Sequence, residues 1–173
     1  TDASSDPWFA PAGLIRGALG SVVRAERKLT SGNRDTLYEA NVNPIATFPG
    51  SGVVVFGQKT LQKKASALDR VNVRRLLIAL KSFIVQVSDN LVFEQNTIAT
   101  RNSFLSQVNP YLESVQQRQG LYAFKVVMDA SNNTPDVVDR NELVGQIYLQ
   151  PTKTAEFIIL DFNVLPTGAT FPS

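Results

Sequence analysis

Apolar residues recur at helical spacing in two central segments of the chain. In residues 73–88 the apolar stripe consists of Leu76, Leu77, Leu80, Ile84 and Val87. In residues 99–119 it consists of Phe104, Val108, Tyr111, Leu112 and Val115. The pattern predicts two helices, with Asn72 as the N-cap of the first. Because proline cannot donate the helical hydrogen bond, the second is expected to kink or break at Pro110.

Strand-forming residues make up four further segments. Residues 53–56 are β-branched and aromatic, and residues 122–128, 143–149 and 156–164 alternate along the chain. In the second segment, Tyr122, Phe124, Val126 and Met128 are expected to share one face. The order of strands and helices predicts an α+β fold, in which the two main helices pack on one face of a small mixed β-sheet and extended arms form the termini.

The first 40 residues carry little periodic apolar pattern. Residues 30–35 have the composition of a loop, and two prolines fix an extended backbone near Trp8. We therefore expect residues 1–40 to be a linker or arm, residues 41–165 to form one domain, and residues 166–173 to be a tail. Since the chain starts at Thr1 and not at Met, we expect it to be a piece of a longer protein.

Composition limits the chemistry that the chain can perform. It contains no His and no Cys, which excludes a Ser-His-Asp triad, disulfides and thiolate metal sites. Residues 52–60 nearly match the phosphate-binding motif G-x-x-x-x-G-K-[ST], but Gln58 lies between the second glycine and Lys59, so the motif is not present. We expect no catalytic residue, no cofactor and no metal site, although chemistry based on carboxylates such as Glu94 and Glu156 remains an alternative.

Charge is divided unevenly along the chain. Residues 1–81 hold 12 basic and 6 acidic side chains, a balance of +6, whereas residues 82–173 hold 5 and 9, a balance of −4. A basic half joined to an acidic half favours head-to-tail association, although a chance distribution explains it equally well.

Basic residues are concentrated near the first predicted helix. Residues 59–81 carry seven of them against one acid, Asp69, and those nearest the helix are Arg70, Arg74, Arg75 and Lys81. These four are candidates for a surface that faces an acidic partner, although the solvated side of an amphipathic helix gives the same pattern. The absence of interleaved aromatic residues argues against nucleic acid.

The last predicted strand is a candidate for pairing with another copy of the chain. It contains Phe157, Ile158, Ile159, Leu160, Asp161, Phe162, Asn163 and Val164. An apolar strand at a chain end can add to a neighbour's sheet, and it can equally pair within its own domain.

Four sequence blocks resemble one known family. Residues 43–61 look like the N-P-I-x-x-F-P-G-x-G-x-x-V-x-G-x-x-T-L block of contractile-tail sheath proteins, and residues 71–76 look like their V-N-V-R-R-L helix start. Residues 93–96 are similar to F-E-P-N, with Gln95 in place of Pro. Residues 150–157 are similar to the ending P-x-x-P-A-E-F, with Thr154 in place of the second Pro.

The resemblance implies a structural role without catalysis. The chain is expected to be the C-terminal domain of a myophage sheath subunit, which assembles with copies of itself into a helical array around the tail tube. Subunit rearrangement would contract the sheath and drive the tube through the host envelope, while strands exchanged between neighbours hold the array together. Expected partners are other copies, the tail tube protein, and baseplate and tail terminator proteins, but neither nucleic acid nor a membrane.

The resemblance also implies a location and leaves one near alternative. The subunit is expected in the tail of the virion, and in the host cytoplasm during assembly. The near alternative is the sheath of a related contractile injection system, such as a bacteriocin or a secretion-like injector.

Overall fold

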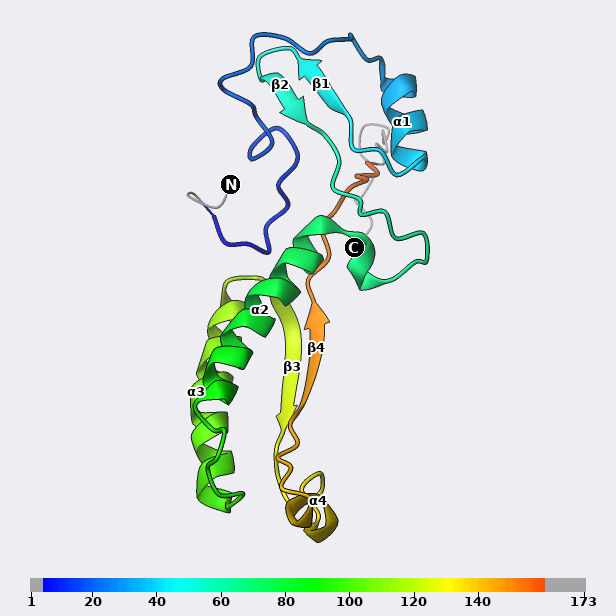
Figure 1. Cartoon of the computed structure of the whole chain (residues 1–173). Coiled ribbons are helices and arrows are strands. Elements are labelled where there is room, and N and C mark those ends of the chain that lie inside the picture. Colours follow the sequence, from blue (N-terminus) through cyan, green and yellow to red (C-terminus); the bar gives the residue numbers. More distant parts are fainter. Residues whose placement is uncertain (1–4, 161–173) are drawn as a thin grey trace, which may run out of the picture.

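The computed structural model describes residues 5–160, and in that range the chain has the α+β fold expected from the sequence (Figure 1). The helices are α1 (Ser31–Glu39), the short 3₁₀ helix η1 (Ala67–Asp69), α2 (Val71–Asp89), α3 (Ile98–Gln117) and α4 (Pro135–Asp139). The strands are β1 (Ile45–Phe48), β2 (Gly52–Val55), β3 (Leu121–Val127) and β4 (Gln146–Pro151). They form two separate antiparallel sheets within the described range, β1–β2 and β3–β4.

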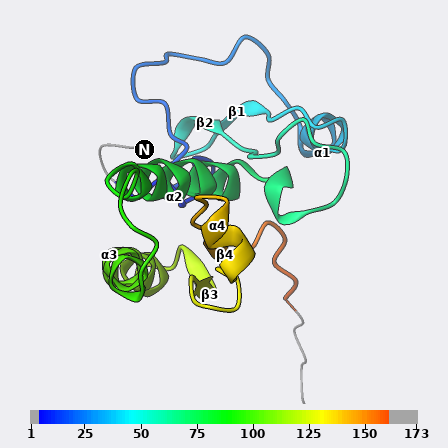
Figure 2. The same cartoon turned by 60° about the horizontal axis from the view of Figure 1, so that its bottom comes forward.

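The main core lies between the two long helices and the β3–β4 sheet. Both helices bury the apolar stripe that their spacing predicts, and Leu76, Leu80 and Leu112 are almost fully buried. Phe124 and Val126 from β3, and Ile147 and Leu149 from β4, pack against this cluster. Figure 2 shows α2 lying between α3 with β3 on one side and α1 with the β1–β2 sheet on the other.

The expected face of β3 is wrong at one residue. Tyr122 is 67% exposed, whereas Leu121 is buried. An irregularity in the pairing with β4 lies between Leu121 and Ala123, so the alternation of inward and outward side chains shifts there.

The predicted N-cap of the first long helix is also wrong, and so is the break that was one of the two outcomes expected at Pro110. Helix α2 begins after Arg70, and Asn72 lies inside the helix, where its buried side-chain amide donates to the backbone oxygen of Trp8. Helix α3 is not broken at Pro110 but continues to Gln117. Pro110 is on the exposed side, so water can reach the backbone oxygen of Ser106 that lacks a helical donor.

The N-terminal segment is more ordered than its composition predicts. Residues 30–35 are not a loop, because Thr30 caps α1 in a capping box with Asn33. Trp8 is only 5% exposed, belongs to the main core, and donates its indole N–H to the backbone oxygen of Arg118 at 2.8 Å. Farther along, residues 13–19 form backbone hydrogen bonds along the outer side of β2. Gly17 fits there because a Cβ would lie 2.5 Å from the backbone oxygen of Val55.

The strand expected at residues 156–164 does not form in the described part of this segment. Residues 152–160 have no regular secondary structure, and the remainder of the segment lies outside the described residues. An isolated extended segment has no backbone partners, and without them a strand is not established.

Candidate functional site

The segment after β4 carries the apolar sequence singled out above, and we call residues 152–160 the C-terminal arm. The arm runs from the end of β4 toward α1 (Figure 1). Phe157, Ile158, Ile159 and Leu160 are 79%, 79%, 87% and 70% exposed. The other four residues of the predicted exchange strand, Asp161, Phe162, Asn163 and Val164, lie outside the described residues. A run of large apolar side chains in water is unfavourable unless a partner covers it.

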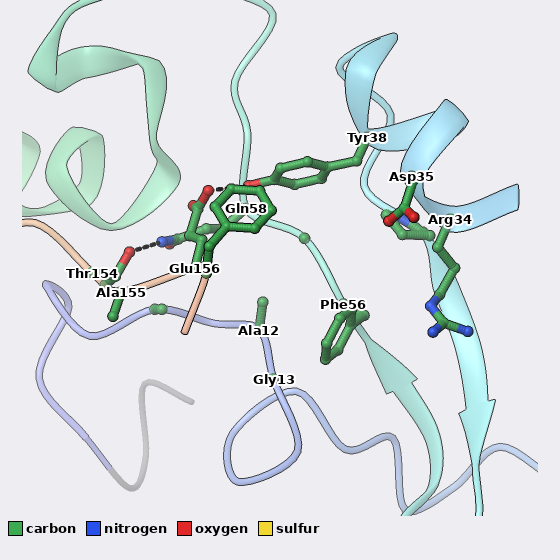
Figure 3. Close-up of a pocket in the computed structure, with 14 residues that line it drawn as sticks. Ala12, Gly13, Arg34, Asp35, Tyr38, Phe56, Gln58, Thr154, Ala155 and Glu156 are labelled. Carbon is green, nitrogen blue, oxygen red and sulfur yellow. Dashed lines mark hydrogen bonds between the residues drawn. The ribbon is translucent and has the colours of Figure 1, made fainter. Parts of the chain in front are cut away.

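The base of the arm is held by one carboxylate, and we call this arrangement the Glu156 anchor. Glu156 accepts hydrogen bonds from Arg70, from Nε at 2.7 Å and from Nη2 at 3.0 Å. The hydroxyl of Tyr38 donates to the same carboxylate at 2.5 Å (Figure 3). Glu156 as a residue is exposed, but its side chain is only 18% exposed. A bidentate pair between Arg and a carboxylate fixes an angle as well as a distance.

The charges around Glu156 favour its ionised form. Burial tends to raise the pKa of Glu156, but the hydrogen bonds from Arg70 and Tyr38 and the charge of Arg70 outweigh burial, so the pKa is lowered. Burial, together with the bond to Glu156, raises the pKa of Tyr38, so its hydroxyl keeps the proton that it donates. Asp69 also lies 3.2 Å from Arg70, which therefore balances two carboxylates.

Two further contacts support the anchor. Gln58 donates to the hydroxyl of Thr154 at 2.6 Å (Figure 3). Lys59 lies 4.0 Å from the ring centre of Tyr38 and donates to the backbone oxygen of Tyr38 at 2.7 Å, which secures α1. A cavity of about 240 Å³ remains between the arm, α1 and the N-terminal segment.

The β1–β2 sheet has one covered edge and one uncovered edge. On the outer side of β2, Val53 and Val55 exchange backbone hydrogen bonds with residues 13–19. On β1, the pairing with β2 directs the backbone groups of Ile45 and Thr47 away from the sheet. Within residues 5–160, no hydrogen bond engages these outward groups. The β1 edge is therefore able to receive another strand.

The structure separates the four basic residues that the sequence grouped. Arg70 precedes α2 and is engaged in the anchor. Arg74 and Lys81 are exposed, and they share one side of α2 with Ile78 and Val85, which are 61% and 46% exposed. Arg75 is partly buried. The candidate surface on α2 is thus a mixed basic and apolar stripe of Arg74, Ile78, Lys81 and Val85.

Sequence reasoning identified the arm but missed what surrounds it. Tyr38 belongs to a helix that was not predicted, and no local spacing connects it with Glu156, 118 residues away. The β1 edge could be suspected only from the short run between Pro44 and Pro49. The two carboxylates of the catalytic alternative do not come together, because Glu94 and Glu156 line different cavities.

The described residues contain neither a metal-binding cluster nor a membrane-spanning helix. No group of three or more acidic side chains there could hold a metal ion. No helix between residues 5 and 160 combines the length and hydrophobicity needed to cross a membrane.

Comparison with known proteins places the chain in a family of structural proteins. Residues 63–165 match the phage tail sheath C-terminal domain, and the chain belongs to this family. It is 44% identical over 171 residues to the tail sheath protein of Vibrio phage KVP40 and 40% identical to that of Enterobacteria phage T4. In both cases the match covers 99% of this chain but 26% of the relative, so the chain spans about a quarter of their length.

Solved structures of contractile sheaths share the fold. The sheath complex of an extracellular contractile injection system, PVC, in its contracted state has a TM-score of 0.84 and 28% identity. The helical sheath of the anti-feeding prophage, also contracted, has a TM-score of 0.83 and 27% identity. Each match covers 94% of this chain and 47% of the other chain.

The lowered pKa of Glu156 predicts how stability depends on pH. Because the folded pKa is below that of an ordinary glutamate, about 4.3, the anchor contributes fully above that value and is lost as the pH falls through the folded pKa. Glu156→Gln should therefore lower the free energy of unfolding by about 1 kcal/mol at pH 7, the upper end for a partly exposed pair. The difference from the wild type should shrink on acidification.

Urea unfolding followed by the fluorescence of Trp8, the single and buried tryptophan, measures this difference. The matched control is Glu113→Gln, since Glu113 is an exposed residue of α3. If Glu156→Gln and Glu113→Gln changed the free energy of unfolding equally at pH 7 and at acidic pH, the anchor would contribute nothing to stability.

Proposed function

We propose that this chain is the C-terminal part of a contractile tail-sheath subunit, which works by packing against copies of itself in a helical sheath around the tail tube. Membership of the sheath family supports the proposal, as do relatives that are named tail sheath proteins. The observation that carries it is that, among the described residues, one chain presents two unpaired features: residues 157–160 of the arm, which are apolar, exposed and without backbone hydrogen bonds, and the strand edge of β1.

Strand addition joins these two features. The β1 edge offers the backbone groups of Ile45 and Thr47, and the arm offers a segment rich in β-branched and aromatic residues. An arm that enters the edge of the next copy makes a heterologous contact, because the two surfaces differ. Contacts of this kind do not close on themselves unless the rotation allows a ring, so they can build an open helical array.

Strand exchange also suits contraction. In our proposal the subunits rearrange as rigid bodies between two packings of their outer surfaces. Backbone hydrogen bonds in an exchanged strand are local, so they hold neighbours together while the bodies move. Contraction then requires no nucleotide, since the extended array already stores the free energy that drives it.

The remaining partners follow from this role. We propose that the domain lies beside the tail tube and that baseplate and tail terminator proteins adjoin the sheath. The subunit would assemble in the host cytoplasm before it forms part of the virion. A baseplate structure of the anti-feeding prophage contains a chain that resembles this one, with a TM-score of 0.82 and 27% identity. The higher identity to phage proteins, 44% against 28%, favours a phage tail over another injection system.

The α2 stripe is the second surface that we propose for assembly. Arg74 and Lys81 would meet acidic groups of the tube or of an adjacent subunit, while Ile78 and Val85 supply apolar contact. The acidic half of the chain makes another copy a suitable partner, with its exposed Asp136 and Glu142 around α4.

We expect loss of backbone pairing to prevent assembly. Thr47→Pro removes an outward amide N–H of β1 without removing a hydrogen bond to β2, whereas Thr47→Ala keeps the amide. Electron microscopy of the full subunit should show striated tubes for Thr47→Ala and none for Thr47→Pro. Deleting the chain from Ile158 onward, which spares Glu156, should also abolish tubes. Normal tubes from both the Thr47→Pro variant and the deletion would contradict strand exchange.

We expect charge reversal on α2 to impair assembly without unfolding the domain. The double variant Arg74→Glu with Lys81→Glu should sediment as small species, while its thermal unfolding stays close to that of the wild type because both side chains are exposed. The control is Lys63→Glu with Lys64→Glu, an equal change of charge in an exposed loop. Tubes of normal yield from the α2 variant would remove this stripe from the proposal.

A further inference from the structure

One carboxylate joins three segments that are far apart in the sequence. Tyr38 comes from α1, Arg70 from the residue just before α2, and Glu156 from the arm. The anchor therefore ties the arm to both parts of the molecule, the part with α1 and the β1–β2 sheet and the part with α2. An ordinary surface ion pair joins two flexible side chains and leaves the backbone of both segments free to move. The anchor instead joins three segments through one carboxylate.

The contacts end abruptly along the arm. Thr152 donates its backbone N–H to the backbone oxygen of Gly120 at 3.2 Å, Thr154 accepts from Gln58, and Glu156 binds Arg70 and Tyr38. Alternate residues are thus fixed up to Glu156. Within the described range, no hydrogen bond holds residues 157–160, whose side chains are exposed. The boundary between the fixed and the unpaired part of the arm falls at Glu156.

Gln58, which donates to Thr154, is itself held by contacts with the residues next to Arg70. Gln58 is 4% exposed, and its backbone oxygen accepts from the N–H of Val71, in the first turn of α2. Lys59 forms a β-bridge with Arg70, so the chain on both sides of the anchor is braced by backbone contacts. Backbone contacts that do not involve the arm therefore hold the chain at Gln58 and Arg70, which receive it.

We propose that Glu156 is the positioning residue of the C-terminal arm: it sets the point and direction from which Phe157 and the following residues leave the domain. The fixing of the arm is a property of this chain alone, and its consequence for a neighbouring copy rests on the proposed function. A strand that leaves at a set angle loses less conformational freedom when it enters a partner's sheet. A subunit without the anchor keeps its fold and its exchange sequence, but presents the sequence on a loose tether.

The absence of native cysteine makes the arm's freedom measurable. Spin labels are placed on Ile159→Cys in the arm and Ser82→Cys on the exposed side of α2, and the distribution of distances between them is measured in the 173-residue chain. We expect one narrow distribution in the otherwise wild-type chain and at least about a twofold greater width in Glu156→Ala. Glu113→Ala is the matched control and should leave the width unchanged.

A pH series separates positioning from general destabilisation. The width in the wild type should increase on acidification, as Glu156 loses its charge among Arg70, Tyr38, Asp69 and Lys59. The width in Glu156→Gln should not depend on pH, and far-ultraviolet circular dichroism should show that each variant stays folded. A wild-type distribution as wide as that of Glu156→Ala would overturn the inference, as would equal widening by Glu113→Ala.

Assembly of the full subunit, scored separately, distinguishes the two proposals. If Glu156→Ala widens the distribution and tubes still form, the positioning role stands and its value for assembly is refuted. If deletion from Ile158 abolishes tubes but Glu156→Ala leaves the distribution narrow, strand exchange stands and the positioning role fails.

Discussion

The hydrogen-bonding capacity of the β1 edge is the constraint on which the account depends. A two-stranded sheet of four-residue strands is marginal by itself, and this one gains support on the β2 side from residues 13–19. On the β1 side, Ile45 and Thr47 keep outward backbone groups that nothing in residues 5–160 satisfies. Residues 157–160 of the arm are exposed and also lack backbone hydrogen-bond partners within the described range. The Glu156 anchor holds the arm immediately before these apolar residues.

The fold could be predicted where burial is periodic. The stripes of α2 and α3 define their helices because both helices bury one side against the same sheet. Pro110 did not break α3, since its missing hydrogen bond faces water, and a helix periodic in its buried residues tolerates this. Tyr122 was misplaced because a shift in strand pairing is not visible in the alternation of a single strand. Helix α1 was missed because it has no buried residue, and its one local signal was the capping pair Thr30 and Asn33.

The candidate site was predictable only in part, for a physical reason. The apolar run in residues 156–164 is visible in the sequence, whereas the exposure of Phe157 to Leu160 is visible only in the structure. Whether Phe157 and its neighbours pair within their own domain depends on which edges are covered, and that is decided by residues 13–19. Nothing in the sequence distinguishes Arg70 from the other basic residues, Arg74 and Lys81. Its different role arises because it precedes α2, where the backbone directs it to Glu156 and not along the helix face.

A disulfide cross-link between the arm of one subunit and the β1 edge of the next tests strand exchange. Thr47→Cys on the β1 edge and Ile159→Cys in the arm introduce the only thiols of the chain. Oxidation of assembled sheaths should then produce a ladder of covalent multimers that neither single variant yields. A product that is cross-linked only within one chain would show that the arm pairs with its own domain, and that result would contradict exchange between subunits.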